Sequence, residues 1–221
     1  GKAETQKQLA QQLATKKTLL EELFHRTKNN MQIISSMLNA ELRRTDNRQQ
    51  AKTLTNIKNK IYALSLVQSK LYESDNLSEI NLRNFISELV QYLLKHFSIN
   101  PARIKLDLQL QDVTLLIDYA LPIGLVINEI VSNIFMHAFP EQTEGEIKIS
   151  LEKNNDQIFL NISDNGIGIP ENYDLSSSDS VGLHNIFNLV KYQLKGDITY
   201  QQKNGLAWQI SFRSDQYKKR I

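Results

Sequence analysis

The sequence predicts an α+β protein in which an antiparallel helical hairpin precedes a layer of helices on one face of a mainly antiparallel sheet. Up to Glu73 the chain has no proline and no glycine after Gly1, and its apolar residues follow helical spacing. Beyond that point, alternating strands mix with helices and show no regular β-α-β order. We therefore expect two domains, 1–75 and 76–221.

Composition places the chain among ordinary globular proteins. Its 221 residues include 41% hydrophobic and 23% charged residues, and the net charge of +2 gives no sign of nucleic-acid binding. There is no cysteine, which excludes disulfides, thiolate metal sites and thiol nucleophiles. No apolar run of about 18 residues indicates a membrane segment. The chain begins at Gly1 without methionine, which suggests a piece of a longer protein.

The first domain contains two helices that leave apolar stripes uncovered. A loose heptad leads into the stretch "LLEELFHRTKNNMQIISSML" (19–38), residues 43–50 break the pattern, and a second apolar stripe follows. The stripes consist of Leu9, Leu13, Leu20 and Leu23, then Leu54, Ile57, Ile61, Leu64 and Leu71. One hairpin cannot bury both stripes, so we expect a four-helix bundle formed by two copies. The alternative is a partner within the second domain.

His25 lies on the polar side of the first helix. At roughly 100° per residue it is about 140° from Leu20 around the helix axis. Glu21, Glu22, Lys28 and Asn29 are within one helical turn of it, along with Gln32 on the same half of the surface. A solvated polar face explains this arrangement, and so does an exposed imidazole available as a nucleophile at neutral pH.

The second domain reads in order as helix, strand, helix, two strands, helix and hairpin. Pro122 is expected in the first turn of the second of these helices, Gly196 is expected to end the third, and Asn204-Gly205 forms the final turn. The predicted ranges are 82–97, 103–110, 119–139, 146–153, 157–164, 180–196 and 197–212.

Three features of this domain suggest a ligand site. Glu129, Asn133 and His137 form a polar stripe on an apolar helix, which requires either internal hydrogen bonds or a ligand or metal. An amide oxygen such as that of Asn133 suits Mg²⁺. In "ISDNGIGIP" (162–170), a strand ends at Asp164, whose carboxylate can accept hydrogen bonds from an exocyclic amine such as that of adenine. A hairpin turn at Asn165-Gly166 is the alternative there.

The third feature is the small-residue segment "LSSSDSVGLHNIF" (175–187). Its serines suit a mobile lid, and Gly182 at the start of a helix offers free N–H groups to phosphate oxygens.

"NEIVSNIFMHAF", "DNGIGIP" and "SVGLHNIFNLVKYQLKG" resemble, in order and spacing, the N, G1 and G2 boxes of the Bergerat-fold ATPases. "FHRTKNNMQIISSML" resembles the H-box of sensor histidine kinases of the second HisKA subtype, close to the HWE group. The resemblance covers nearly everything from Leu19 to Phe212. It implies a Bergerat-fold α/β sandwich for 76–221, and a dimerisation and phosphotransfer hairpin for 1–75.

The resemblance also implies residue roles. His25 becomes the phosphoacceptor, Glu22 or Glu21 the group that orients it, and Lys28 and Asn29 neighbours of the phosphoryl group. Glu129 becomes the N-box acid, Asn133 the Mg²⁺ ligand and Asp164 the adenine reader. The other nucleotide-binding residues would be His137, Gly166, Gly168, Gly182 and Leu183.

We therefore expect an ATP- and Mg²⁺-dependent kinase that phosphorylates its own His25 and passes the phosphoryl group to an aspartate of a response-regulator receiver domain. The upstream sensor domain is absent from this chain, and a cytoplasmic location is expected, whether or not a larger sensor anchors it. The rivals are a Bergerat-fold serine kinase of the anti-sigma type and a phosphotransfer scaffold that does not use ATP.

Two positions depart from the family. Many kinases of the broader class carry an acid directly after the histidine, where this chain has Arg26. Related N boxes usually carry lysine three residues after the Mg²⁺-binding asparagine, where this chain has Met136. If residue 136 faces the phosphates, the missing charge predicts weak ATP affinity and slow autophosphorylation, unless Lys191, Lys195 or the N–H groups at Gly182 compensate.

Overall fold

The computed structural model describes residues 1–73, 78–97, 103–140, 144–170, 175 and 181–217. The chain divides into two compact units, Gly1–Asp75 and Asn76–Ile221, and each is described by itself.

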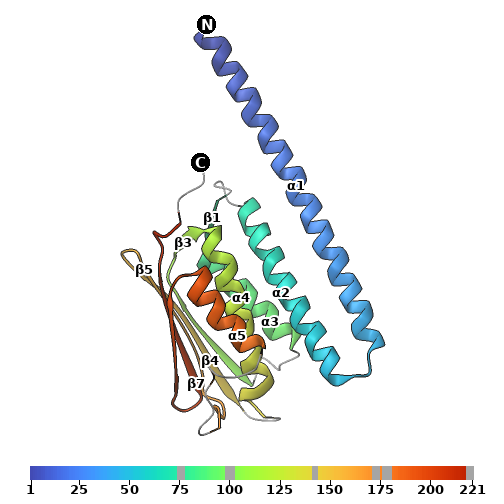
Figure 1. Cartoon of the computed structure of the whole chain (residues 1–221), viewed down its shortest axis with the longest axis vertical. Helices are drawn as coiled ribbons and strands as arrows, with labels where there is room; N and C mark the ends of the chain where they lie inside the picture. The colour runs from blue at the N-terminus through green and yellow to red at the C-terminus, as the bar shows by residue number, and fades with distance from the viewer. Residues whose placement is uncertain (74–77, 98–102, 141–143, 171–174, 176–180, 218–221) are drawn as a thin grey trace. The chain divides into compact units, whose positions relative to one another are not determined.

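The first unit is an antiparallel pair of helices, α1 (Lys2–Arg44) and α2 (Arg48–Glu73) (Figure 1). Only residues 45–47 separate them, a shorter break than the eight-residue break expected from the sequence. The reason is a side-chain cap, because the Asn47 carboxamide oxygen accepts hydrogen bonds from the N–H groups of Gln49 at 2.9 Å and Gln50 at 3.1 Å. This cap lets α2 begin within the polar segment.

No described residue of α1 is buried, although the helix carries many apolar side chains. Its largest exposed ones are Leu9, Leu13, Leu19, Leu23, Ile33, Ile34 and Met37. A single copy of the hairpin therefore leaves an apolar surface along most of the length of α1.

The second unit is built on a five-stranded sheet with the strand order β2-β4-β5-β7-β6. Its strands are β2 (Ile104–Leu110), β4 (Gly145–Asn154), β5 (Gln157–Asp164), β6 (Asp197–Gln202) and β7 (Leu206–Arg213). β2 and β4 are parallel, and the other neighbours are antiparallel. The prediction of a mainly antiparallel sheet is thus confirmed.

The helices of this unit lie on one face of the sheet, as the α+β prediction requires (Figure 1). They are α3 (Leu82–His96), α4 (Ile117–Asn133) and α5 (Val181–Asn188). α4 and α5 continue into π-helical turns, η1 (Ile134–Ala138) and η3 (Leu189–Gln193). The core between helices and sheet includes the fully buried side chains of Phe85, Leu89, Ile123, Ile127, Ile149, Leu160, Ile162 and Leu194.

Some local expectations differ from the structure. Two short strands, β1 (Glu79–Asn81) and β3 (Thr114–Leu116), form a separate antiparallel pair that three-residue patterns are too short to reveal. α4 begins at Ile117, so Pro122 lies beyond its first turn. Lys195, with φ 49°, adopts the left-handed conformation that was expected of Gly196.

By length and composition, one segment among the described residues could cross a membrane, Ile117–Ala138, which is α4 with η1. Of its most apolar window, 72% is buried inside the protein. This segment is the central helix of the core, which explains its apolar composition.

Candidate functional site

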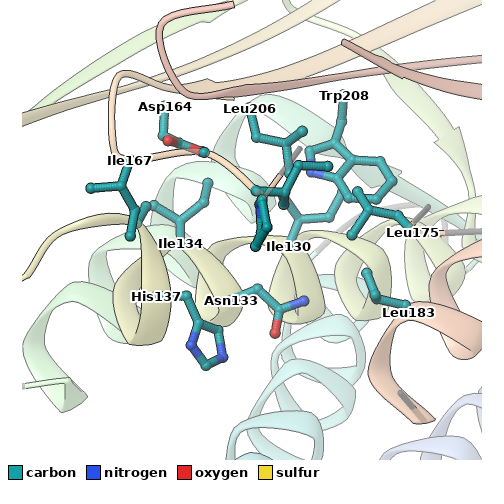
Figure 2. A pocket seen from close by; sticks show the side chains of 14 residues that line it. Ile130, Asn133, Ile134, His137, Asp164, Ile167, Leu175, Leu183, Leu206 and Trp208 are labelled. Atoms are coloured by element: carbon teal, nitrogen blue, oxygen red, sulfur yellow. The ribbon is translucent and has the colours of Figure 1, made fainter. Parts of the chain in front are cut away.

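The second unit contains a pocket of about 430 Å³, a volume typical of small-molecule sites. Figure 2 shows residues of α4 and η1 on one side and those from the strand ends on the other. Its lining consists of Ile130, Asn133, Ile134, His137, Ala138, Asp164, Ile167, Gly168, Ile169, Pro170, Leu175, Leu183, Leu206 and Trp208. Most of these side chains are apolar, and the polar ones are few enough to orient a ligand.

The polar stripe of α4 reaches this pocket only in part. Asn133, at the end of α4, and His137, in η1, line it. Glu129, one turn earlier, is 2% exposed and is not among the fourteen lining residues. Asn133 and His137 are therefore the members of the stripe that line the pocket, and their roles toward a ligand stay predictions.

The π-helical turn also changes the position of Met136. In a turn with i→i+5 hydrogen bonds, each residue rotates less about the helix axis than in an α-helix. Residue 136 therefore lies farther from the Asn133 side of the helix, while His137 stays near that side. Met136 is accordingly not among the described residues that line the pocket. The assumption that residue 136 faces the phosphates is not supported, and His137 occupies the pocket wall instead.

Among the described residues that line the pocket, Asp164 is the one carboxylate, and it is 7% exposed. It is the last residue of β5, and its Oδ1 accepts a hydrogen bond from the Gly166 N–H at 2.8 Å. Burial raises the pKa of the Asp164 carboxyl above its usual value, whereas the N–H groups of Gly166 and Leu206 lower it in part. A buried acceptor of this kind, held by the Gly166 N–H, suits a ligand N–H group.

The loop after Asp164 is fixed on two sides. The Asn165 carboxamide oxygen accepts a hydrogen bond from the Glu146 N–H at 2.7 Å, and the Asn165 N–H donates to the Glu146 carbonyl at 3.2 Å. The Ile167 N–H donates to the carbonyl of Ala138 in η1 at 2.9 Å. A side chain on Gly166 would lie 2.3 Å from that carbonyl oxygen. Glycine at 166 therefore lets the loop pack against the helix end.

The tip of the β6–β7 hairpin, residues 202–206, contacts the same loop. The Gln202 side chain donates to the Ile169 carbonyl at 2.7 Å, beside Gly168 with its φ of 70°. A Cβ atom on Gly205 would lie 2.1 Å from the Asp164 carbonyl oxygen and 2.8 Å from its Oδ1. The sequence indicated a turn at Asn204-Gly205 but gave no sign that this turn touches the pocket.

The predicted phosphate-side segment is described only in part. Gly182 is the second residue of α5, and Leu183 lines the pocket. The serines at 176–178, together with Ser180, lie outside the described residues, as does most of the expected lid.

The first unit carries the remaining candidates on α1. His25 is exposed, and its ring centroid lies 5.8 Å from that of Tyr72 on α2. The Glu22 carboxylate accepts a hydrogen bond from Arg26 Nε at 2.8 Å, so its shown partner is Arg26. Lys28 and Asn29 are exposed one turn beyond His25. An orienting role for Glu22 or Glu21 stays a prediction.

The residues present fit a magnesium ion that is held mainly by its substrate. Within the described ranges, no group of three or more histidine, cysteine or acidic side chains forms a metal cage. Asn133 supplies one oxygen at the pocket wall. A Mg²⁺ ion needs few protein ligands when phosphates and water complete its octahedron.

Comparison with known families identifies both parts of the chain. Residues 22–97 match the HisKA_2 family, described as histidine kinase. Residues 118–216 match the family of histidine kinase-, DNA gyrase B-, and HSP90-like ATPases. The second match contains every residue that lines the pocket.

Individual relatives agree with these families. The sensor histidine kinase PdtaS of Mycobacterium tuberculosis is 30% identical over 190 residues, which is 84% of this chain and 37% of PdtaS. Blue-light-activated histidine kinase 2 of Erythrobacter litoralis is 26% identical over 78% of this chain and 50% of its own length. The chain thus spans about half or less of these relatives.

A solved structure shows the same fold. The histidine kinase domain of the Erythrobacter litoralis EL346 blue-light activated kinase superposes with a TM-score of 0.66 at 18% identity, covering 85% of this chain and 95% of that domain. The predicted helical hairpin and Bergerat-type α/β sandwich are confirmed as the fold class. The chain carries a HisKA_2 histidine kinase domain followed by a histidine kinase-, DNA gyrase B- and HSP90-like ATPase domain, and it belongs to the histidine kinases.

Proposed function

We propose that the chain is the ATP-dependent catalytic core of a sensor histidine kinase, which phosphorylates itself on His25. The observation that carries this proposal is Asp164, a nearly buried carboxylate in an apolar pocket of about 430 Å³. The Gly166 N–H holds the carboxylate, which accepts a hydrogen bond from the exocyclic amine of adenine. The apolar side chains of Ile130, Leu206 and Trp208 exclude water from the base.

Asn133 and His137 form the polar part of the pocket wall and bind the phosphate end of the nucleotide. Asn133 would hold Mg²⁺ through its side-chain oxygen, and the ion would supply neutralisation of the triphosphate charge. Glu129, buried behind the pocket lining, is proposed as the N-box acid that supports Asn133 from one turn away.

In the transfer step, a neutral ring nitrogen of His25 attacks the γ-phosphorus of ATP. A P–N bond forms, the P–O bond to the β-phosphate breaks, and ADP leaves. His25 suits this role because it is exposed and therefore accessible to a second domain. The product is a phosphoramidate, which then passes its phosphoryl group to an aspartate of a receiver domain in a response regulator.

Dimerisation and location are part of the proposal. The exposed apolar side chains along α1 need a partner, and a second copy of the hairpin supplies a matching surface in a four-helix bundle. Because the reaction draws on ATP, we place the catalytic unit in the cytoplasm.

Incubation of the chain with Mg·ATP labelled in the γ-phosphate tests the function. We expect an acid-labile and base-stable label that His25→Gln abolishes and His96→Gln retains, since His96 lies in the other unit on α3. An acid-stable label would indicate a serine kinase. Absence of ATP binding, with transfer from a phosphorylated regulator intact, would indicate a scaffold. Label retained by His25→Gln would refute the assignment.

A further inference from the structure

The tip of the β6–β7 hairpin lies against Asp164. Gly205 leaves no space for a side chain, because a Cβ atom there would lie 2.1 Å from the Asp164 carbonyl oxygen and 2.8 Å from Oδ1. The backbone N–H of the next residue, Leu206, lies close enough to the Asp164 carboxylate to lower the pKa of that carboxyl. Leu206 also lines the pocket, next to Asp164 in Figure 2.

The tip has the conformation of a tight hairpin turn that requires glycine at position 205 for two separate reasons. Asn204 and Gly205 both have positive φ, 50° and 103°, and the Lys203 N–H donates to the Gly205 carbonyl at 3.1 Å. A φ of 103° is readily adopted only by glycine. The same residue therefore satisfies the turn and permits the close approach to Asp164.

The carboxylate is held from two different elements. The Gly166 N–H, on the loop that follows β5, donates to Oδ1 at 2.8 Å, and the Leu206 N–H, at the start of β7, approaches the carboxylate from the hairpin and lowers its pKa. Two donors fix the plane of a carboxylate group, whereas one leaves it free to rotate about the Cβ–Cγ bond. The orientation of the carboxylate decides whether its free lone pairs point at a base in the pocket.

We propose that Gly205 and the Leu206 N–H are positioning groups that determine base specificity, by holding the Asp164 carboxylate in the orientation that accepts an exocyclic amine. This inference rests on the proposed ATP-binding function and adds a second structural element to it. The hairpin tip, which the sequence indicated only as a turn, thereby becomes part of the adenine site.

The test compares ATP with purine riboside triphosphate, which differs from ATP only in lacking the 6-amino group. Calorimetry on the full chain measures both affinities. The wild type should favour ATP by roughly tenfold to a hundredfold, the value of one charge-assisted hydrogen bond. In Gly205→Ala the added methyl group should displace the Asp164 carboxylate. The variant should then lose most of the preference for ATP, chiefly through weaker ATP binding, while the analogue binds nearly as before.

Gly196→Ala is the matched control. A Cβ atom at Gly196 meets a backbone carbonyl oxygen just as closely, that of Ser211 at 2.3 Å, but at the opposite end of the same hairpin. It should lower the melting temperature and leave the ratio of the two affinities unchanged. A loss of the ratio in both variants would show a general effect of strain and would overturn the proposal.

If Gly205→Ala does not fold, replacement of the Leu206 amide by an ester decides the matter, because it removes the N–H donor and adds no side-chain atom. The preference for ATP should fall, and the loss of ATP binding on acidification should begin at higher pH, since this donor lowers the pKa of Asp164. A folded variant of either kind with the wild-type ratio refutes the inference alone. Failure of the wild type to bind ATP refutes the proposed function and this inference with it.

Discussion

Replacing Asp164 by asparagine should separate nucleotide binding from stability. Asparagine keeps one oxygen that can accept the Gly166 N–H, now 2.8 Å from Oδ1, but its amide group turns donors toward the adenine amine. Loss of the charge-assisted bond, with a donor facing a donor, should cost about 2–4 kcal/mol in ATP binding. That corresponds to a loss of roughly thirtyfold to a thousandfold in affinity.

The effect of the same change on stability has the opposite sign. Burial raises the pKa of Asp164 above its usual value of 3.8, so the folded chain binds this proton more readily than the unfolded chain. The free energy of unfolding therefore falls as the pH rises from 3.8 to the raised pKa, and the cost persists at neutral pH. Asp164→Asn removes the ionisable group, so the melting temperature at pH 7 should equal or exceed that of the wild type, and the difference should vanish in acid.

Calorimetric titration with ATP measures the affinity, and thermal melts at neutral and acid pH measure the stability. Asp197→Asn, which changes a side chain that is 84% exposed, serves as the control and should alter neither property. Unchanged ATP affinity in Asp164→Asn would rule out Asp164 as the adenine reader. A melting temperature that drops at neutral pH but not in acid would refute the sign of the burial effect.

Four other changes probe the remaining roles. Asn133→Asp should spare recognition of adenosine but change the Mg²⁺ dependence of ATP binding, which titration at several metal concentrations measures. His137→Gln should weaken the binding of ATP more than that of ADP, because His137 lines the pocket. Met136→Lys should change neither affinity, because Met136 is not among the described lining residues. Tighter ATP binding by Met136→Lys would contradict this placement. Asn29→Ala should slow dephosphorylation of the partner regulator more than autophosphorylation, and equal loss of both rates would indicate a structural role.

The elements with a strong period were predictable from the sequence. The strands at 104–110, 145–154 and 157–164 follow alternating patterns, and their observed bounds lie within a residue or so of the expected ones. Membership in the histidine kinases was predictable because several sequence boxes occur in the expected order, and the family matches confirm it. The parallel pairing of β2 with β4 was not predictable, since the residues of one strand do not encode the direction of its neighbour.

The sequence pointed to Asp164 as a pocket residue because the strand pattern ends there and glycines follow, and its role toward a nucleotide stays a prediction. The site was not predictable where backbone geometry decides. A π-helical turn has no distinct apolar pattern, so the sequence pattern predicted an α-helical position for residue 136. The approach of Gly205 to Asp164 joins residues 41 apart through the pairing of β5 with β7, which only the folded sheet establishes.

The Asn165 side chain limits how far the loop beside the pocket can move. Its carboxamide oxygen accepts the Glu146 N–H where a strand carbonyl would otherwise do so, one position beyond the last β4–β5 pair, Ile147 with Asp164. A side chain thus completes the final rung of the ladder and frees the main chain to turn. Rearrangement of the loop on nucleotide binding should therefore stop at residue 165, and the Glu146 amide should exchange with deuterium equally slowly with and without nucleotide.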